Sequence, residues 1–409
     1  MRLAKISLHT SPYTALGTGD GGGMNVVVKQ QAEALGRLGH RVELFTRRDD
    51  PETPEIMETA PGVRLHTLEA GPAKPLPKSR IDDHLDQFTQ GLRRRLHELE
   101  VVEESVDLIH SHHWMSGLAA LPIAREFRVP HVQSYHSVAA LPDHPLSDGE
   151  PPESPDRVPG EALIARESDL VLAVSNAEAR TVIERCGADP ARVQVLHPGV
   201  DTELFHPLEA GETGWRCCDM GRPYLLFAAR LQPLKGPDLA LEALALIPER
   251  FRPHLVIAGE VSADFRDHHA DIEHLAHQLG VAGDVVYSGS RPRPEFAAMM
   301  RGARLLLVPS HSETFGLVAL EASASGVPVV SSAAGGLVEA VHDGQSGIVV
   351  PSRDPMEWAE TITRLLLDTE EHARLSAGGL RRVEGQDWLS VSERLADVYE
   401  AMISAGVVG

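Results

Sequence analysis

Short apolar runs that alternate with helical patterns constrain this chain more strongly than any other feature. Six runs in the first half are typical of buried parallel strands: AKISLHTS, RVELFTR, VDLIHSH, PHVQSYH, DLVLAVS and VQVLHPG. Six more begin near residue 223: PYLLFAARL, HLVIAGE, DVVYSGS, RLLLVPS, VPVVSSA and GIVVPS. Helical segments fit between the runs of both series, as in α/β proteins. Because 409 residues exceed one ordinary core, two successive α/β domains of similar size are predicted.

The segment 197–215, HPGVDTELFHPLEAGETGW, is rich in Pro, Gly and acidic residues and lacks sustained periodicity, so it is the linker candidate. We therefore predict domains at 1–205 and 206–385, with a ligand cleft between them. A helical segment over 386–409 is expected to pack back on the first domain. The six prolines of 142–160 predict an exposed loop.

The charge balance excludes some partners. Acidic residues outnumber basic ones 59 to 38, and the formal charge of −21 argues against nucleic acid or an anionic membrane surface. No window approaches eighteen uninterrupted apolar residues and no signal peptide is recognised, so we expect no stable membrane insertion and a cytoplasmic location. Three cysteines (Cys186, Cys217 and Cys218) lack metal-site spacing and are expected to be reduced thiols.

The stretch GTGDGGGMNVVVKQQ places five glycines within residues 17–23, between a predicted strand and a predicted helix. Strand, glycine loop and helix together direct backbone N–H groups and a positive helix end toward an anion. Glycine would be needed there for close approach of a phosphate or for a positive φ. The pattern is not a P-loop, since no Lys-Ser or Lys-Thr follows the glycines, and the alternative is a tight turn.

Two further motifs fit the same kind of ligand. ARLQPLKG places Arg230 and Lys235 after a predicted strand, where two cations could neutralise a leaving diphosphate, or could be an ordinary solvated pair. SETFGLVALEA carries Glu313 and Glu321, which would stand about 12 Å apart along a continuous helix. This separation exceeds the roughly 5 to 9.5 Å between the two catalytic carboxylates of a glycosidase. The two glutamates would therefore bind different parts of one extended ligand, or they are ordinary surface glutamates. Phosphate would meet the N–H groups of Gly316, Leu317 and Val318.

Together the glycine loop, ARLQPLKG, ETFGLVALE and ASGVPVVSSAAGGLVEAVHDGQSG resemble, in order, the retaining glycosyltransferases of family GT4. The resemblance implies a GT-B fold: an α/β architecture of two Rossmann-like domains facing each other across a deep cleft. Within that family, HTSP, SHHWMSG and RLQPLKGPD are most similar to the members of mycothiol biosynthesis that transfer GlcNAc from UDP-GlcNAc to 1D-myo-inositol 3-phosphate.

The resemblance also implies roles for particular residues. On the donor side, Gly23 would meet the diphosphate, Arg230 and Lys235 the phosphates, Arg291 the uracil, Glu313 the sugar and Glu321 the ribose. His136 matches the family histidine near the reacting sugar, so Arg230, Lys235, Glu313 and His136 are the catalytic candidates. On the acceptor side, the matches are Asn25, Lys78 and Arg157, while His113 and Ser137 stand where the family has Tyr and Thr. These two departures leave the acceptor open.

The family view of the reaction requires no protein nucleophile: the leaving UDP departs toward the cations and takes the acceptor proton. No metal-ligand spacing is present, so no cofactor is expected, although Mg²⁺ could stimulate turnover through the nucleotide. The expected partners are a nucleotide sugar and a small phosphorylated polyol, and a homodimer is one possible assembly. Alternatives are a family member with another acceptor, such as a sucrose-phosphate-synthase-like or cyclitol enzyme, and a non-catalytic sugar-nucleotide binder.

Overall fold

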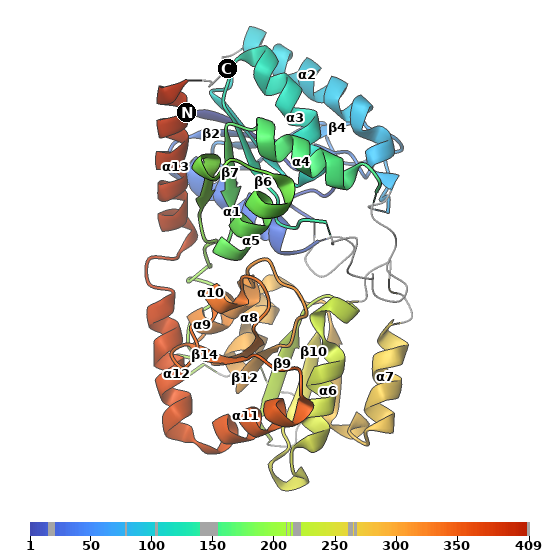
Figure 1. Ribbon diagram of the computed structural model, residues 1–409, viewed down its shortest axis with the longest axis vertical. Coiled ribbons are helices and arrows are strands. Elements are labelled where there is room, and N and C mark those ends of the chain that lie inside the picture. The colour runs from blue at the N-terminus through green and yellow to red at the C-terminus, as the bar shows by residue number, and fades with distance from the viewer. Residues whose placement is uncertain are drawn as a thin grey trace.

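The computed structural model describes residues 1–14, 21–77, 80–102, 105–139, 154–209, 211–212, 214–215, 222–260, 265 and 268–406. Its elements form two α/β lobes, and both ends of the chain lie at the same lobe (Figure 1). Each lobe is built on one largely parallel sheet with helices against its faces, so the predicted fold class is confirmed. The predicted strand runs of both series all form strands.

The first sheet has eight strands in the order β3-β4-β2-β1-β5-β6-β7-β8. Its strands are β1 (Arg2–Ile6), β2 (Arg41–Arg47), β3 (Ile56–Ala60), β4 (Val63–Leu68), β5 (Leu108–His112), β6 (His131–Ser134), β7 (Leu170–Ala173) and β8 (Val193–Val195). The helices are α1 (Gly23–Arg37), α2 (Leu85–Val102), α3 (Trp114–Phe127), α4 (Arg157–Glu167) and α5 (Asn176–Thr181). The central strands are buried along their whole length, which explains why they read as continuous apolar runs.

Two features of this lobe differ from the sequence prediction. The pair β3 and β4 was not predicted; it is an antiparallel hairpin closed by Pro61-Gly62, and β4 continues the sheet parallel to β2. The Pro-Gly dipeptide was the available signal. The predicted exposed loop over 142–160 is also wrong at its end, because α4 begins at Arg157, which is buried. The rest of that loop, up to residue 153, lies outside the described residues.

The second sheet is entirely parallel, in the order β11-β10-β9-β12-β13-β14. Its strands are β9 (Tyr224–Ala228), β10 (His254–Ala258), β11 (Val285–Gly289), β12 (Leu305–Val308), β13 (Val329–Ser332) and β14 (Gly347–Val350). The helices are α6 (Pro237–Leu246), α7 (His268–Gln278), α8 (Arg293–Gly302), α9 (Leu317–Ala324), α10 (Leu337–Ala340), α11 (Pro355–Leu367) and α12 (Thr369–Arg382).

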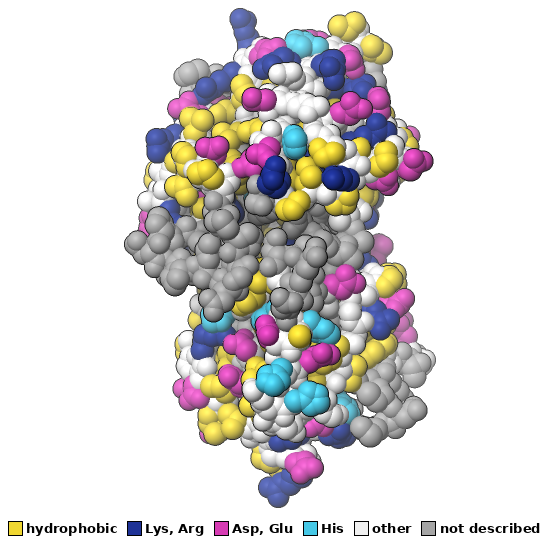
Figure 2. Space-filling model, turned by 90° about the vertical axis from the view of Figure 1, so that its right-hand side faces the viewer, with side chains coloured by type: hydrophobic (Ala, Val, Ile, Leu, Met, Phe, Trp, Pro, Cys, Tyr) yellow, Lys and Arg dark blue, Asp and Glu magenta, His cyan; other side chains and the backbone are white. Residues whose placement is uncertain are grey.

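The last helix, α13 (Trp388–Ala405), runs along the first lobe (Figure 1). It packs against α1, and its Leu395 and Tyr399 belong to the same buried cluster as Val28 and Leu35. On the face drawn in Figure 2, acidic and basic side chains are interspersed over both lobes. Within the described residues, no helix has the length and apolar character needed to cross a membrane.

Candidate functional site

A cavity of about 490 Å³ lies where the carboxyl ends of strands from both sheets meet. In each sheet the strand order reverses at one place, between β1 and β5 in the first and between β9 and β12 in the second. Such reversal points leave a crevice at the strand ends, which is where α/β proteins bind ligands. His9 follows β1 and His113 follows β5, while Arg230 follows β9 and Glu313 follows β12; all four line the cavity.

Most residues selected from the sequence line this one cavity. They are Gly23, Asn25, His113, His136, Ser137, Arg230, Lys235, Arg291, Glu313, Gly316, Leu317, Val318 and Glu321. Arg157 is not among the lining residues; it lies behind Ser137, with its Nη2 3.2 Å from the hydroxyl, and is also paired with Glu161 at 2.9 Å. Lys78 lies outside the described residues.

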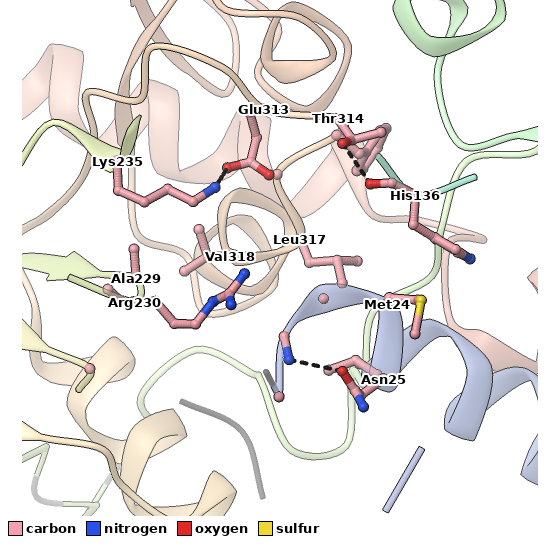
Figure 3. Close-up of a pocket in the computed structure, with 18 of the residues that line it drawn as sticks. Met24, Asn25, His136, Ala229, Arg230, Lys235, Glu313, Thr314, Leu317 and Val318 are labelled. Carbon is pink, nitrogen blue, oxygen red and sulfur yellow. Dashed lines mark hydrogen bonds and ion pairs between the residues drawn. The ribbon is translucent and has the colours of Figure 1, made fainter. Parts of the chain in front are cut away.

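Lys235 and Glu313 form an ion pair on one wall of the cavity, with Nζ 2.6 Å from Oε2 (Figure 3). Lys235 ends a 3-10 turn, Pro233–Lys235, that leads into α6. Glu313 lies in the loop before α9, so the two glutamates of the motif do not share a helix and the spacing computed for a continuous helix does not apply. Arg230 extends from the end of β9 toward the start of α9 (Figure 3). The wall therefore offers two cations and one carboxylate.

The start of α9 depends on glycine. Gly316 is its N-cap with φ of 102°, a backbone conformation that other residues rarely adopt. The N–H groups of Leu317 and Val318 open the helix and have no partner within it, which suits an anion. Behind them, Gly335 and Gly336 pack on the Glu313–Thr314 backbone, where a Cβ on either would lie about 2 Å from a carbonyl oxygen.

Glu321 is buried at the far end of the cavity, paired with Arg293 at 2.8 Å between Nη2 and Oε1. The Arg293 guanidinium also stacks 4.6 Å from the centre of the Phe205 ring. Arg291, the residue selected from SRPRPEF, lines the cavity and pairs with Glu295 at 3.6 Å. Sequence reasoning missed Arg293, because the repeated Arg-Pro gives no basis for choosing between the two arginines.

In the described part of the glycine loop, residues 21–23, Gly22 and Gly23 lack the positive φ that was one of the two predicted reasons for glycine there. Gly22 is extended and Gly23 is the first residue of α1. A Cβ on Gly23 would lie 3.2 Å from Cδ1 of Leu317 in the other lobe, so space is tight at this glycine. Asn25 accepts the Gly22 N–H at 2.9 Å and donates to Thr10 and to the Ser11 carbonyl, so its amide holds the loop.

The opposite wall includes His9, His113 and His136. His113 and His136 both have positive φ, of 72° and 60°, a strain that persists only where the surroundings enforce it. The His9 and His113 rings lie 4.1 Å apart. Behind the wall, Nδ1 of His112 lies 2.9 Å from Nε2 of His136, and the His110 and His112 rings are 4.1 Å apart. Burial holds the pKa of His110 and His112 well below the ordinary histidine value.

Hydrogen bonds join the two lobes next to the cavity. The Thr314 hydroxyl donates to the His136 carbonyl at 2.8 Å, and the Ser175 hydroxyl donates to the Thr314 carbonyl at 2.8 Å. The Glu339 carboxylate of the second lobe accepts from the first residues of α5, Asn176 and Ala177, and from His197. Glu313 thus sits beside a residue that bonds to both His136 and Ser175. Within the described chain, no cluster of three or more His, Cys, Asp or Glu side chains could hold a metal ion.

Comparison with known families identifies two matching models. The model described as Glycosyltransferase Family 4 matches residues 21–204, and the one described as Glycosyl transferases group 1 matches residues 218–382. Proteins of Thermomonospora curvata and Thermobifida fusca, both named D-inositol 3-phosphate glycosyltransferase, are each 39% identical to this chain. The alignments cover 97% of this chain and 95% and 93% of those proteins.

Solved structures with the same fold cover the whole molecule. The sucrose-phosphate synthase of Thermosynechococcus elongatus is 26% identical with a TM-score of 0.86, and 99% of both chains align. The Anabaena protein HepE, solved with UDP and glucose, is 18% identical with a TM-score of 0.75 over 98% of this chain and 100% of its own.

Proposed function

The chain belongs to glycosyltransferase family 4, and we propose that it transfers GlcNAc from UDP-GlcNAc to 1D-myo-inositol 3-phosphate with retention of the anomeric configuration. That it is a glycosyltransferase follows from its family and from relatives 39% identical over nearly the full chain. The proposal of this donor and acceptor rests on those relatives' name and on one observation: a wall with Arg230, Lys235 and Glu313 faces a wall with His113, His136 and Ser137 across one cavity.

On the donor wall we assign the diphosphate to Arg230, Lys235 and the opening N–H groups of α9. These groups are fixed before the reaction, so they stabilise the charge that develops on the leaving UDP without reorganisation. Glu313 binds the donor sugar hydroxyls and Glu321 the ribose hydroxyls, since carboxylates accept strong hydrogen bonds from both. We assign the uracil to Arg291 and assign Arg293, which also lines the cavity and is paired with Glu321, to the same end of the donor.

The proposed mechanism assigns positioning and electrostatics to the protein. UDP leaves toward Arg230 and Lys235, an oxocarbenium-like sugar forms, and the acceptor hydroxyl enters on the same face. Its proton passes to the leaving phosphate oxygen, so charge and protons balance without a protein base. No resident metal is part of this proposal, and Mg²⁺ would act only through the nucleotide. Turnover should therefore persist in EDTA, which a steady-state assay checks directly.

We assign the acceptor phosphate to Ser137 and the Arg157 guanidinium behind it, with His113 next to the ring, and the family resemblance adds Lys78. Ser137 and His113 are also the two departures from the family pattern, so a different sugar phosphate is the second candidate acceptor. The 26% identity and TM-score of 0.86 with sucrose-phosphate synthase favour testing fructose 6-phosphate beside inositol phosphate. The cytoplasmic location and the homodimer stay predictions.

The deciding experiment incubates the purified protein with UDP- and GDP-sugars, with and without each acceptor, and follows products by mass spectrometry. A GlcNAc-inositol phosphate product supports the proposal in full. A product that forms only with fructose 6-phosphate would change the acceptor assignment and leave the assignment of the donor wall unchanged. Lys78→Ala should raise the KM for the true acceptor and leave the donor KM unchanged; normal acceptor use would remove Lys78 from the site.

A further inference from the structure

His136 is held from three directions although its backbone is strained. Its carbonyl accepts from the Thr314 hydroxyl at 2.8 Å, and its backbone N–H lowers the pKa of the buried carboxyl of Glu178, against the larger effect of burial. Its ring nitrogen Nε2 lies 2.9 Å from Nδ1 of His112. A positive φ of 60° is a backbone conformation that persists where the surroundings enforce it. His136 also lines the cavity, so its ring orientation bears on what the cavity can bind.

The other ring nitrogen of His112 decides which way the bond between the two histidines runs. Nε2 of His112 is buried and has no hydrogen-bond partner among the described residues. If His112 carried its proton there, a buried N–H would be left unpaired. With the proton on Nδ1, only a lone pair is left unpaired. Buried N–H groups without a partner are the rarer and costlier case, so His112 donates from Nδ1 to Nε2 of His136.

Both rings are neutral when they make this bond. Burial, followed by the nearby charge of Lys5, lowers the pKa of His136 to about 3. Burial likewise places the pKa of His112 well below the ordinary value, with further contributions from His110, Lys5 and His136. A neutral imidazole carries one proton, and Nε2 of His136 is already an acceptor. The proton of His136 is therefore on Nδ1.

We propose that His112 is a positioning residue that fixes His136 as the Nδ1–H tautomer, so that His136 gives a hydrogen bond to an oxygen of the donor sugar and cannot act as a base. The assignment of this cavity to a donor sugar rests on the proposed function. His136 lines the cavity, and because its Nε2 is occupied by His112, Nδ1 is the ring nitrogen left to bond a ligand. A histidine in this form offers the acceptor hydroxyl no lone pair.

The tautomer can be read without any substrate. Two-bond ¹H–¹⁵N spectra of the full-length protein labelled with ¹⁵N-histidine distinguish a protonated ring nitrogen from a bare one, and His136→Asn assigns the signal by its loss. We expect His136 to show a protonated Nδ1 and a bare Nε2 between pH 6 and pH 8. A protonated Nε2, or a ring that titrates in this range, overturns the proposal. Absence of sugar transfer would instead remove the proposed function, because this spectrum does not depend on it.

Two variants of matched size test what His112 does for the reaction. The amide nitrogen of His112→Asn can replace Nδ1 as donor, whereas His112→Leu cannot donate at all. We expect His112→Leu to lower kcat about tenfold or more with little change in donor KM, the effect of one lost hydrogen bond in the transition state. His112→Asn should keep kcat within about threefold and keep the Nδ1–H signal. Equal kcat and an unchanged His136 spectrum in His112→Leu would overturn the inference.

Discussion

Lys235 has a carboxylate partner in the free cavity and, in the proposed reaction, a diphosphate partner. The Nζ of Lys235 lies 2.6 Å from Glu313, so the cation is already oriented before a ligand binds. Charge on the diphosphate grows as the sugar departs, so the contribution of Lys235 is larger in the transition state than in the bound ground state. This difference predicts an effect on turnover rather than on binding alone.

We expect Lys235→Ala to lower kcat at saturating donor by about 100-fold or more, the usual cost of removing one fixed group from a developing oxyanion. Steady-state kinetics with the donor varied measures it. Lys29→Ala, on the outward side of α1, is the matched control and should change kcat less than about twofold. Unchanged kcat in Lys235→Ala would disprove the role in leaving-group departure.

Glu43 on β2 provides a residue-scale test of stability that is separate from the site. It is buried and bonded to Arg2, Arg64 and His66. Burial alone would raise its pKa, but the bonds from His66 and Arg64 outweigh burial and lower the pKa to about 2. A carboxyl with a lowered pKa adds stability above its unfolded pKa of 4.5, and this contribution is lost as pH falls toward 2.

Glu43→Gln should therefore lower the free energy of unfolding of the first lobe by about 3 kcal/mol at pH 7, and the difference should close between pH 4.5 and pH 2. Urea midpoints at a series of pH values measure the difference. Glu58→Gln, on the exposed side of β3, should leave the midpoint unchanged at every pH. A Glu43→Gln difference that stays constant with pH would contradict the assignment.

At the scale of elements, the beginning of α9 is the most demanding piece of backbone in the cavity. Gly316→Ala combines a φ of 102° with a Cβ 2.5 Å from Cδ2 of Leu337. We expect the helix start to shift and the donor KM to rise about tenfold or more, since the strain is of the order of 1–3 kcal/mol. Gly283→Ala, where a Cβ meets nothing within 4 Å, is the control for donor KM and for thermal stability. Equal donor KM values in the two variants would contradict the proposed dependence of donor binding on Gly316.

The secondary-structure elements also differ in how well the sequence predicts them. Apolar runs located the central strands because these are buried on both faces, and glycine and charge motifs at strand ends located the donor wall. The β3–β4 hairpin was missed because its exposed first strand lacks an apolar run. The bond from His112 to His136 could not be predicted, because it joins strand ends 24 residues apart through ring orientations that only packing determines.

At the scale of the molecule, Glu339 links the two lobes. Its carboxylate accepts from the Asn176 N–H at 2.9 Å and side-chain amide at 2.7 Å, from Ala177 at 3.0 Å, and lies 3.0 Å from His197. We expect these bonds to favour the present separation of the cavity walls. Hydrogen bonds to a charged group contribute about 1.5–3 kcal/mol, enough to shift an equilibrium between open and closed forms.

Glu339→Ala should increase the radius of gyration of the ligand-free protein in small-angle X-ray scattering and raise the donor KM about tenfold or more. Saturating UDP should reverse much of the change in radius, because the ligand binds both walls. The control is Glu360→Ala on the exposed side of α11, which should match the unaltered protein. Identical scattering curves for Glu339→Ala and the control would show that Glu339 does not hold the lobes together.

Helix α13 has a consequence for the order in which the molecule is made. The ribosome synthesises this helix after the entire second lobe, yet its Tyr399 fills the core of the first and lies 2.5 Å from Nδ1 of His110. When β1 to β8 have left the ribosome, the apolar side chains that α13 will bury are still uncovered. They stay uncovered until the last turns of α13 have been synthesised. The first lobe would then complete its folding after the second, and a chain stalled before residue 388 would be a substrate for chaperones and proteases.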